Sequence, residues 1–422
     1  MNFRFALLGA GMAVALTACS PAQLVQLRAE RTMDRAINEA VNSMDQSKDI
    51  KPTQLRVATY NTSLYDDKAR GLIDRLQRGD VEAQKIAAVI QTMRPDVVLL
   101  NEFDYDTKGE AADLFQKNYL ARGQFGQTAI DYPYRYFAEV NTGVPSGLDL
   151  DGNGTVGGEG RNAGNDAWGY GLHPGQYGML VLSRYPIDTA NVRTFQKLKW
   201  SSMPQALQPI DPKTNQPYYK PNVWSQLRLS SKSHWDVPIT VGTKKFHLLA
   251  AHPTPPVFDG PEDRNGKRNH DEIRLWREYL NNTANNTWLC DDKQRCGGLN
   301  NDAAFVIVGD YNADPIDGDG VPNAINQLLN HPRSAANNTP RSLGAIETAA
   351  AYGYTRKGDV SMHTGDFGKN NGTLRLDYVI PSKQFRINGQ GVFWPTKQDA
   401  AAKYASASDH HMVWMDLSLQ GF

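Results

Sequence analysis

Residues 305–315 read FVIVGDYNADP, and this stretch is the most informative part of the sequence. The apolar run FVIV predicts a short buried strand, which Gly309 interrupts. Asp310 and Asn312 follow two residues apart, so both leave the strand on the same side of an extended backbone. A carboxylate and an amide in this arrangement suit the orientation of a water molecule and the binding of an oxyanion. The same residues also fit an ordinary Asx turn after a strand, so the stretch alone leaves both interpretations open.

Other strand-like runs also carry a polar residue of catalytic type. Three of them deliver it at their end, LRLDYVI carries Asp377 inside an otherwise apolar run, and Asp409 and His410 lead into the last run. These runs are, in chain order, LRVATYN (55–61) with Asn61, DVVLLNE (96–102) with Glu102, FHLLAAHPTPP (246–256) with His252, LRLDYVI (374–380) with Asp377, and SDHHMVWMDL (408–417) with Asp409 and His410. Ligands of open α/β sheets bind beyond the carboxyl ends of the strands. We therefore expect these residues to form one shared site.

In this order, the motifs resemble those of the endonuclease/exonuclease/phosphatase superfamily. The superfamily includes pancreatic-type deoxyribonucleases, abasic-site endonucleases, inositol polyphosphate phosphatases and sphingomyelinases. The resemblance extends from about residue 55 to about residue 417, and the complete set of motifs is specific for the superfamily but not for one substrate. It implies an α/β (α+β) fold, a four-layer sandwich in which two mixed β-sheets pack face to face with helices outside.

Hydrolysis of a phosphoester requires neutralisation of the phosphate charge, an activated water and help for the leaving oxygen. The resemblance implies a divalent metal ion, magnesium (Mg²⁺) or Mn²⁺, for the first requirement. Glu102 is the expected metal ligand, with Asn61 and Asp409 close enough in the family pattern to join it. The alternative for Glu102 is an exposed carboxylate at the end of a strand.

The resemblance also implies the catalytic residues. His410 is the expected general base, and Asp377 would fix its tautomer and raise its proton affinity. Asp310 and Asn312 would orient the attacking water and hold a phosphoryl oxygen. His252 would bind another non-bridging oxygen or assist the leaving group, although a lone histidine at a strand end is usually structural.

Substrate-binding residues are expected just before the strand GMLVLSRYPI (178–187). Gln176 and Tyr177 fall where family members place side chains that contact phosphate. The match is loose, and Tyr170 competes for the same role.

Residues 141–176 form a glycine-rich stretch without periodicity. Within it, Asp149, Asp151, Asn153 and Gly154 match the first half of a calcium-binding loop. The second half does not match, because position twelve is a glycine. The interpretations are therefore a structural Ca²⁺ site and a plain flexible loop, and the role of the stretch in substrate choice is not evident from the sequence.

The first 18 residues have the pattern of a signal peptide. One positive charge, at Arg4, precedes an apolar stretch that is too short to span a bilayer. The segment Leu16-Thr17-Ala18-Cys19 resembles the bacterial lipobox, which predicts lipid modification of Cys19 after cleavage; an ordinary signal peptide is the alternative. Ser20 follows instead of aspartate, as in lipoproteins of the outer membrane. We expect a signal peptide over 1–18, a lipidated cysteine with a spacer helix over 19–50, and a catalytic domain over 51–422 that faces the periplasm or the exterior.

Two cysteines remain when Cys19 is lipidated. Cys290 and Cys296 lie six residues apart in the polar segment WLCDDKQRCGG (288–298). In an exported protein this spacing predicts a disulfide. The alternative, a metal site, would require further thiol or imidazole ligands, and those are distant in the sequence.

Composition limits the class of protein. The chain has 422 residues with 21% charged and 40% hydrophobic residues, which suits one large globular domain. Lys plus Arg number 45, and so do Asp plus Glu, so the chain lacks the basic excess of a tight non-specific nucleic-acid binder. We expect an exported, monomeric phosphoesterase that acts on phosphodiesters or phosphomonoesters, anchored to the membrane by its lipid. The alternatives are an extracellular nuclease acting on DNA or RNA, and a binding lipoprotein without catalytic activity.

Overall fold

The structure, a computed structural model, describes residues 54–336, 339–353 and 355–419. Two mixed sheets form its centre. The first sheet has the order β14-β15-β1-β2-β4-β3 and the second has the order β13-β10-β9-β8-β5. The first sheet contains β1 (Leu55–Leu64), β2 (Val97–Phe103), β3 (Tyr134–Tyr136), β4 (Met179–Ser183), β14 (Phe385–Val392) and β15 (Val413–Leu419). The second contains β5 (Arg193–Thr194), β8 (His234–Val241), β9 (Lys244–Ala251), β10 (Phe305–Asp310) and β13 (Asp377–Pro381).

Helices and short elements complete the fold. The α-helices are α2 (Gly71–Arg78), α3 (Val81–Met93), α4 (Glu110–Phe115), α5 (Arg161–Asn165), α6 (Pro221–Trp224), α7 (Arg264–Asn281), α8 (Asn326–Leu329), α9 (Leu343–Tyr352), α10 (Gly368–Asn371) and α11 (Ala402–Ala405). The short elements are the π-helix η2 (Gln116–Leu120), the 3-10 helices η3 (Trp200–Ser202), η4 (Asn286–Trp288) and η5 (Val360–Met362), and the two strand pairs β6 (Ile210–Asp211) with β7 (Gln216–Pro217) and β11 (Gly365–Asp366) with β12 (Thr373–Leu374).

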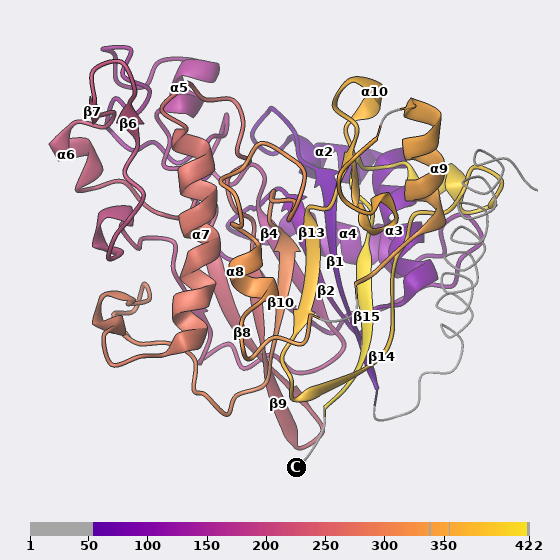
Figure 1. Ribbon diagram of the computed structural model, residues 1–422. Coiled ribbons are helices and arrows are strands. Elements are labelled where there is room, and N and C mark those ends of the chain that lie inside the picture. The colour runs from indigo at the N-terminus through magenta and orange to yellow at the C-terminus, as the bar shows by residue number, and fades with distance from the viewer. Residues whose placement is uncertain (1–53, 337–338, 354, 420–422) are drawn as a thin grey trace, which may run out of the picture.

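The apolar side chains divide into three cores, which define four layers. The central core joins the two sheets, with Val57 and Leu99 from the first sheet and Val237 and Val306 from the second. A second core lies between the first sheet and helices α2, α3 and α4, and a third lies between the second sheet and helices α7 and α8. Figure 1 shows α7 on one side of the sheets and α2 and α3 on the other. The predicted sandwich of two mixed sheets with helices outside is confirmed.

Strand directions explain why one edge of the sandwich collects the polar residues. The pairs β1–β2 and β9–β10 are parallel, so their carboxyl ends lie together. Strands β13 and β15 run antiparallel to β10 and β1, so these two strands begin where their neighbours end. Asp377 is therefore the first residue of β13 and lies directly opposite Asp310. The sequence analysis placed Asp377 within a strand, and the structure corrects this to a strand start.

Apolar residues at helical spacing predict a helix that Asp80 caps and Pro95 ends, a second helix over His270–Tyr279 and a third near 321–329, and these predictions have different outcomes. Helix α3 is confirmed, because Asp80 caps it by accepting a hydrogen bond from the backbone N–H of Ala83 at 2.7 Å. The helix predicted over His270–Tyr279 begins earlier, at Arg264, because its first turns bury polar side chains and so lack an apolar stripe. The helix predicted near 321–329 shrinks to the four residues of α8.

The remaining predictions about organisation concern the termini and the glycine-rich stretch. The predicted signal peptide and spacer helix lie outside the described residues. The glycine-rich stretch is largely irregular and contains only the short helix α5. Within the described part of the chain, no helix is both long and apolar enough to cross a bilayer.

Arg56 joins three elements at the edge of the sandwich away from the polar residues. Its guanidinium, which is 1% exposed, donates two hydrogen bonds to the carboxylate of Asp416 at 2.7 and 2.8 Å and a third to the carbonyl of Met93. It also lies 4.3 Å from the ring centre of Trp414. The pair is bidentate and fully buried, so each charge depends on the other for its compensation.

We predict that Arg56→Met lowers the free energy of unfolding by about 3–5 kcal/mol, because it leaves the Asp416 carboxylate buried without its partner. Denaturant unfolding followed by circular dichroism measures the change. The control is Lys85→Met, which removes a half-exposed ion pair with Glu82 and should cost less than about 1 kcal/mol. Equal losses in the two variants would contradict the structural role of Arg56.

Candidate active site

Asp310 lies at the centre of the candidate site. It ends β10, and its carboxylate is 1% exposed. Its Oδ2 accepts a hydrogen bond from the Asn61 amide at 3.0 Å and lies 3.5 Å from Nε2 of His252 and 3.6 Å from Nε2 of His410. Its Oδ1 accepts the backbone N–H of Asn312 at 2.9 Å. Four of the sequence-predicted residues therefore converge on one buried carboxylate.

Asn61 connects Asp310 to Glu102. Its Nδ2 donates to Oε1 of Glu102 at 3.0 Å as well as to Asp310, and its Oδ1 accepts the N–H of Ser63. The residues come from the ends of β1 and β2, which are neighbours in the first sheet. Glu102 is only partly buried, whereas Asn61 is 1% exposed. The Glu102 carboxylate is thus the part of this chain of contacts that is open to solvent.

His410 and Asp377 form a second buried pair. Nδ1 of His410 lies 2.8 Å from Oδ2 of Asp377, which also accepts the hydroxyl of Thr364 at 2.7 Å. The backbone of the same threonine accepts the N–H of His411, so the segment before β15 is held against it. This contact directs Nε2 of His410 toward Asp310. The orientation is the one that a general base beside a water-orienting carboxylate requires.

Neighbouring groups shift the pKa values of His410, Asp310 and His252 in different directions. Burial disfavours a charge on His410, but the carboxylates of Asp377 and Asp310 outweigh it and raise its pKa well above the ordinary value. Burial alone would raise the pKa of Asp310, but His410, His252 and Asn61 hold it well below its usual range. Burial and the nearby ammonium of Lys232 lower the pKa of His252. His252 therefore favours its neutral form, whereas His410 favours its protonated form.

Backbone strain accompanies the site. Glu102 has φ = 54°, Asn312 has φ = 50° and Tyr177 has φ = 56°, all in the left-handed region that costs energy for residues other than glycine. Asn312 also donates a side-chain hydrogen bond to the carbonyl of Pro253 at 3.1 Å, which ties it to the segment after His252. Strain of this kind persists only where surrounding contacts impose it, and it clusters at functional sites.

The donor set fits a hard divalent cation. Glu102 and Asp409 offer carboxylate oxygens that solvent can reach, and the Asn61 side chain lies within hydrogen-bond distance of Glu102. Asp409 is exposed and accepts a hydrogen bond from Ser63, two residues after Asn61. Glu102, His252 and Asp310 also place one ligand atom each within 4.8 Å of one another. Such oxygen-rich sites that retain water suit Mg²⁺ or Mn²⁺.

The two predicted substrate-binding residues have different environments. Gln176 is fully buried, and its amide donates to the carbonyl of Asp66 and accepts from the N–H of Leu172. These contacts make Gln176 a structural residue, so its placement does not support a contact with substrate. Tyr177 is partly exposed, and its ring centre lies 4.6 Å from that of Tyr65 near Glu102.

Lys232 is a candidate that the sequence analysis missed. It lies in SSKSHW (230–235), just before β8, the strand that pairs antiparallel with the strand leading to His252. Its side chain is 6% exposed, and burial lowers its pKa although Glu272, Glu102 and Asp310 lie near enough to oppose this. Its ammonium makes no hydrogen bond to any residue that the structure describes. The sequence offered one signal for this residue. Lys232 comes just before β8, and β8 pairs with β9, the strand that leads to His252.

Two features predicted outside the site can be located. The sulfur atoms of Cys290 and Cys296 are bonded in the structure. Asp149, Asp151 and Asp166 place carboxylate oxygens within 4.8 Å of one another, and the two oxygens of Asp166 accept the backbone N–H groups of Leu150 and Gly157. Carboxylates often cluster without a cation, and the calcium site stays a prediction.

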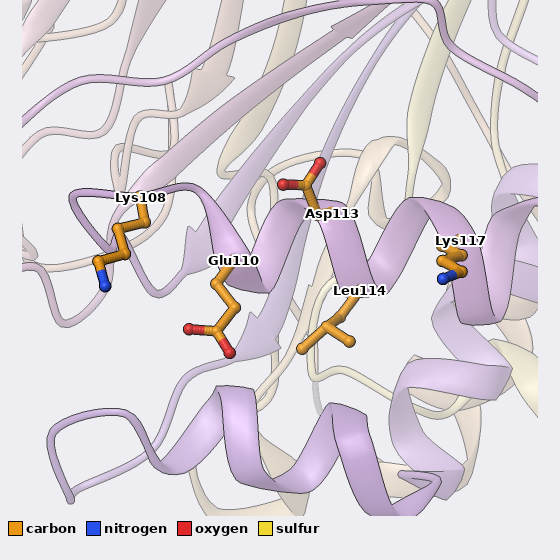
Figure 2. Close-up of a pocket in the computed structure, with 5 residues that line it drawn as sticks. All are labelled: Lys108, Glu110, Asp113, Leu114 and Lys117. Carbon is orange, nitrogen blue, oxygen red and sulfur yellow. The ribbon is translucent and has the colours of Figure 1, made fainter.

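A surface hollow lies elsewhere, along α4. Figure 2 shows its lining residues, Lys108, Glu110, Asp113, Leu114 and Lys117. None of the candidate site residues lines it. Glu110 is already engaged by hydrogen bonds from Arg70 and Gln77, so the hollow is a salt-bridged helix surface.

The chain is similar to known proteins in sequence pattern and in fold. The model of the Endonuclease/Exonuclease/phosphatase family matches residues 58–410, whereas no curated protein matches the sequence. Similar solved structures include an endonuclease/exonuclease/phosphatase from Beutenbergia cavernae DSM 12333, at 19% identity and a TM-score of 0.49, with 87% of this chain and 72% of that chain covered. They also include sphingomyelinase C from Streptomyces griseocarneus, at 18% identity and a TM-score of 0.43, with 86% and 99% covered. A magnesium-bound beta toxin mutant from Staphylococcus aureus has 14% identity and a TM-score of 0.41, with 87% and 100% covered. These three likenesses are too weak to select a substrate.

We predict that His410→Ala reduces kcat by about 10²–10⁴-fold, because it removes the proton acceptor of the site. Asp377→Asn should also reduce kcat, since it removes the charge that orients and stabilises the imidazole. The double variant should be about as slow as His410→Ala alone, because both changes disable one unit.

Hydrolysis of bis-p-nitrophenyl phosphate with Mg²⁺ measures the three rates, and circular dichroism checks the fold. His331→Ala, a buried histidine bonded to Asn281 at the far end of α7, is the control and should retain turnover. Fully multiplicative losses would show that His410 and Asp377 act separately.

Proposed function

Because the chain belongs to the endonuclease/exonuclease/phosphatase family, we propose that it is a divalent-metal-dependent phosphoesterase in which an activated water attacks the phosphorus atom. The observation that carries the proposal is the convergence of Asn61, His252 and His410 on the Asp310 carboxylate. Members of the family are hydrolases that act on phosphoesters. A binding protein without activity would not need a buried proton acceptor and a neutral imidazole around the Asp310 carboxylate, or the strained backbone of Glu102 nearby.

Each side chain has a role that follows from its contacts. A bound Mg²⁺ or Mn²⁺ would supply charge neutralisation, held by Glu102 with Asn61 and Asp409. Asp310, kept ionised by its neighbours, orients the water. His410 is the proposed proton acceptor, and the Asp377 carboxylate at Nδ1 fixes its tautomer and stabilises the imidazolium that forms.

The neutral His252 and the buried Lys232 face the phosphoryl oxygens. His252 donates a hydrogen bond there, and Lys232 offsets negative charge in a place of low dielectric. Among the described residues, the Lys232 ammonium makes no hydrogen bond, and the nearby carboxylates of Glu272, Glu102 and Asp310 favour its charged form; we propose that it binds a phosphoryl oxygen.

The proposed substrate is a small phosphodiester or phosphomonoester. Equal numbers of basic and acidic residues favour a small substrate over a long nucleic acid, whose binding depends on many phosphate contacts. The alternative is a nuclease, and the Tyr65–Tyr177 pair beside Glu102 supports it, because paired aromatic rings suit the stacking of a base. We propose further that the protein is a monomer.

We predict hydrolysis in the presence of Mg²⁺ or Mn²⁺ and its loss with a chelator. Purified protein is tested against p-nitrophenyl phosphate, bis-p-nitrophenyl phosphate, plasmid DNA and sphingomyelin. Glu102→Gln retains the shape but removes the charge, so activity falls steeply and excess Mg²⁺ restores part of it. An unchanged metal titration of the variant would exclude Glu102 as a ligand, and turnover of none of the substrates would refute the proposed function.

We propose also that the protein is an outer-membrane lipoprotein, anchored through Cys19 and facing the periplasm or the exterior. The support is the lipobox-like segment of the sequence. Cys19→Ala should move the protein from the membrane fraction to the soluble fraction of a bacterial host. Ser20→Ala, which leaves the cysteine in place, is the control. A Cys19→Ala protein that still fractionates with membranes would argue against lipid anchoring.

A further inference from the structure

Helix α7 carries an unusual set of buried polar residues. Asn269, Asp271 and Glu272 have no exposed surface, and Arg268 is 8% exposed. Fully buried carboxylates are rare unless other groups compensate them. The contacts of these residues therefore show what the helix holds in place.

Glu272 holds two segments that both lead into the site. Its Oε1 accepts the backbone N–H of Ser231 at 2.6 Å, and its Oε2 accepts the backbone N–H of Thr254 at 2.6 Å. Ser231 immediately precedes Lys232, and Thr254 comes two residues after His252. One carboxylate thus fixes the distance between the segments that present the two phosphate-facing groups.

We propose that Glu272 is a positioning residue that joins the Lys232 and His252 segments into one preformed oxyanion-binding pair. The inference rests on the proposed function and deepens it, because it explains how phosphate-facing groups from two different segments stay in register. Among the residues that the structure describes, Glu272 makes no hydrogen bond to Asp310 or to the proposed metal ligands.

Neighbouring contacts brace the same two segments. The carbonyl of Glu272 lies 2.9 Å from Nε2 of His234, whose Nδ1 lies 2.6 Å from the hydroxyl of Ser230. One turn earlier, Asn269 donates to the carbonyls of Thr254 and Tyr311, both at 2.8 Å. Helix α7 therefore also ties the His252 segment to the residue after Asp310.

The glycine-rich stretch supports the Lys232 segment from the opposite direction. The N–H of Asn141 donates to the carbonyl of Lys232 at 2.9 Å. A Cβ atom added to Gly169 would lie only 1.9 Å from the carbonyl oxygen of Ser231, so only glycine permits this approach. The segment of Lys232 is thus held between α7 and the stretch that the sequence analysis could not interpret.

The two hydrogen bonds explain why the residue is a glutamate. Two backbone N–H groups face it, and only a carboxylate offers an acceptor to both. A glutamine would direct its own N–H₂ group at one of them and break that bond. The carboxylate also lies near the Lys232 ammonium, so its charge favours the charged form of the lysine.

Asp271 provides a matched control on the next position of the same helix. It is equally buried, and its Oδ2 accepts two hydrogen bonds of 2.7 Å, from the indole of Trp200 and the N–H of Leu207. Neither donor belongs to a segment that carries a site residue. Asp271→Asn and Glu272→Gln each turn a buried carboxylate of α7 into an amide. Asp271→Asn removes the charge but can keep both acceptor bonds on its one amide oxygen, and neither of these bonds leads into the site.

The experiment compares Glu272→Gln, Asp271→Asn, Lys232→Met and the double variant Lys232→Met/Glu272→Gln. Thermal unfolding measures the loss of stability of each helix variant, so that an effect on the site can be separated from an effect on the fold. We expect Glu272→Gln to lower kcat/KM for bis-p-nitrophenyl phosphate by up to about 100-fold, because small misplacements of binding groups have effects of this size. Asp271→Asn should stay within about twofold of the wild type. The loss in the double variant should be smaller than the product of the two single losses, because part of the effect of Glu272→Gln acts through Lys232.

Binding of inorganic phosphate in the presence of Mg²⁺, measured by calorimetry, separates this inference from the proposed function. Weaker phosphate binding by Glu272→Gln than by Asp271→Asn supports the positioning role even when the wild type hydrolyses none of the substrates. Equal losses of phosphate binding and of kcat/KM in the two helix variants would overturn it, and wild-type turnover would then still support the proposed function. Fully multiplicative losses of kcat/KM in the double variant would also overturn it.

Discussion

The arrangement depends on one buried charge, the carboxylate of Asp310. An ionised carboxylate with 1% exposure is unfavourable by several kcal/mol unless other groups compensate it. The compensating groups are Asn61 from the first sheet, His252 from the second sheet, and His410 from the segment before β15. They reach Asp310 only when the two sheets pack with their strand ends at one edge. The site therefore assembles only when the central core between the two sheets is packed.

The energy for this assembly comes from contacts outside the site. Glu102, Asn312 and Tyr177 adopt left-handed backbone conformations, and each residue is held by neighbours rather than by its own preference. Helix α7 contributes in the same way, because the Asn269 amide donates to, and the Glu272 carboxylate accepts from, backbone groups of the site segments. A site built in this way is stiff before any ligand arrives, which lowers the reorganisation needed during a reaction.

The candidate site could largely be predicted because each of its residues lies within or beside a recognisable strand. The family, the two mixed sheets and the cap of α3 also follow from local patterns of this kind. The extent of α7 could not be predicted, because buried polar residues in its first turns have the same sequence pattern as a solvated surface. The buried state of Gln176 and the placement of Lys232 were missed for a related reason, since a polar side chain does not reveal whether backbone groups or water will surround it.

The sequence alone determined which segments become strands, which chemical groups those strands carry, and in what order they occur. These properties depend on neighbours within a few residues, through side-chain periodicity and turn chemistry. Only the tertiary structure decided that Asn61 and Asp310, which are 249 positions apart, share a hydrogen bond, and that Glu272 joins two segments that lead into the site. Contacts between residues so far apart in the sequence arise from the packing of whole sheets and helices. The burial of a side chain likewise depends on the residues that surround it rather than on the residue itself.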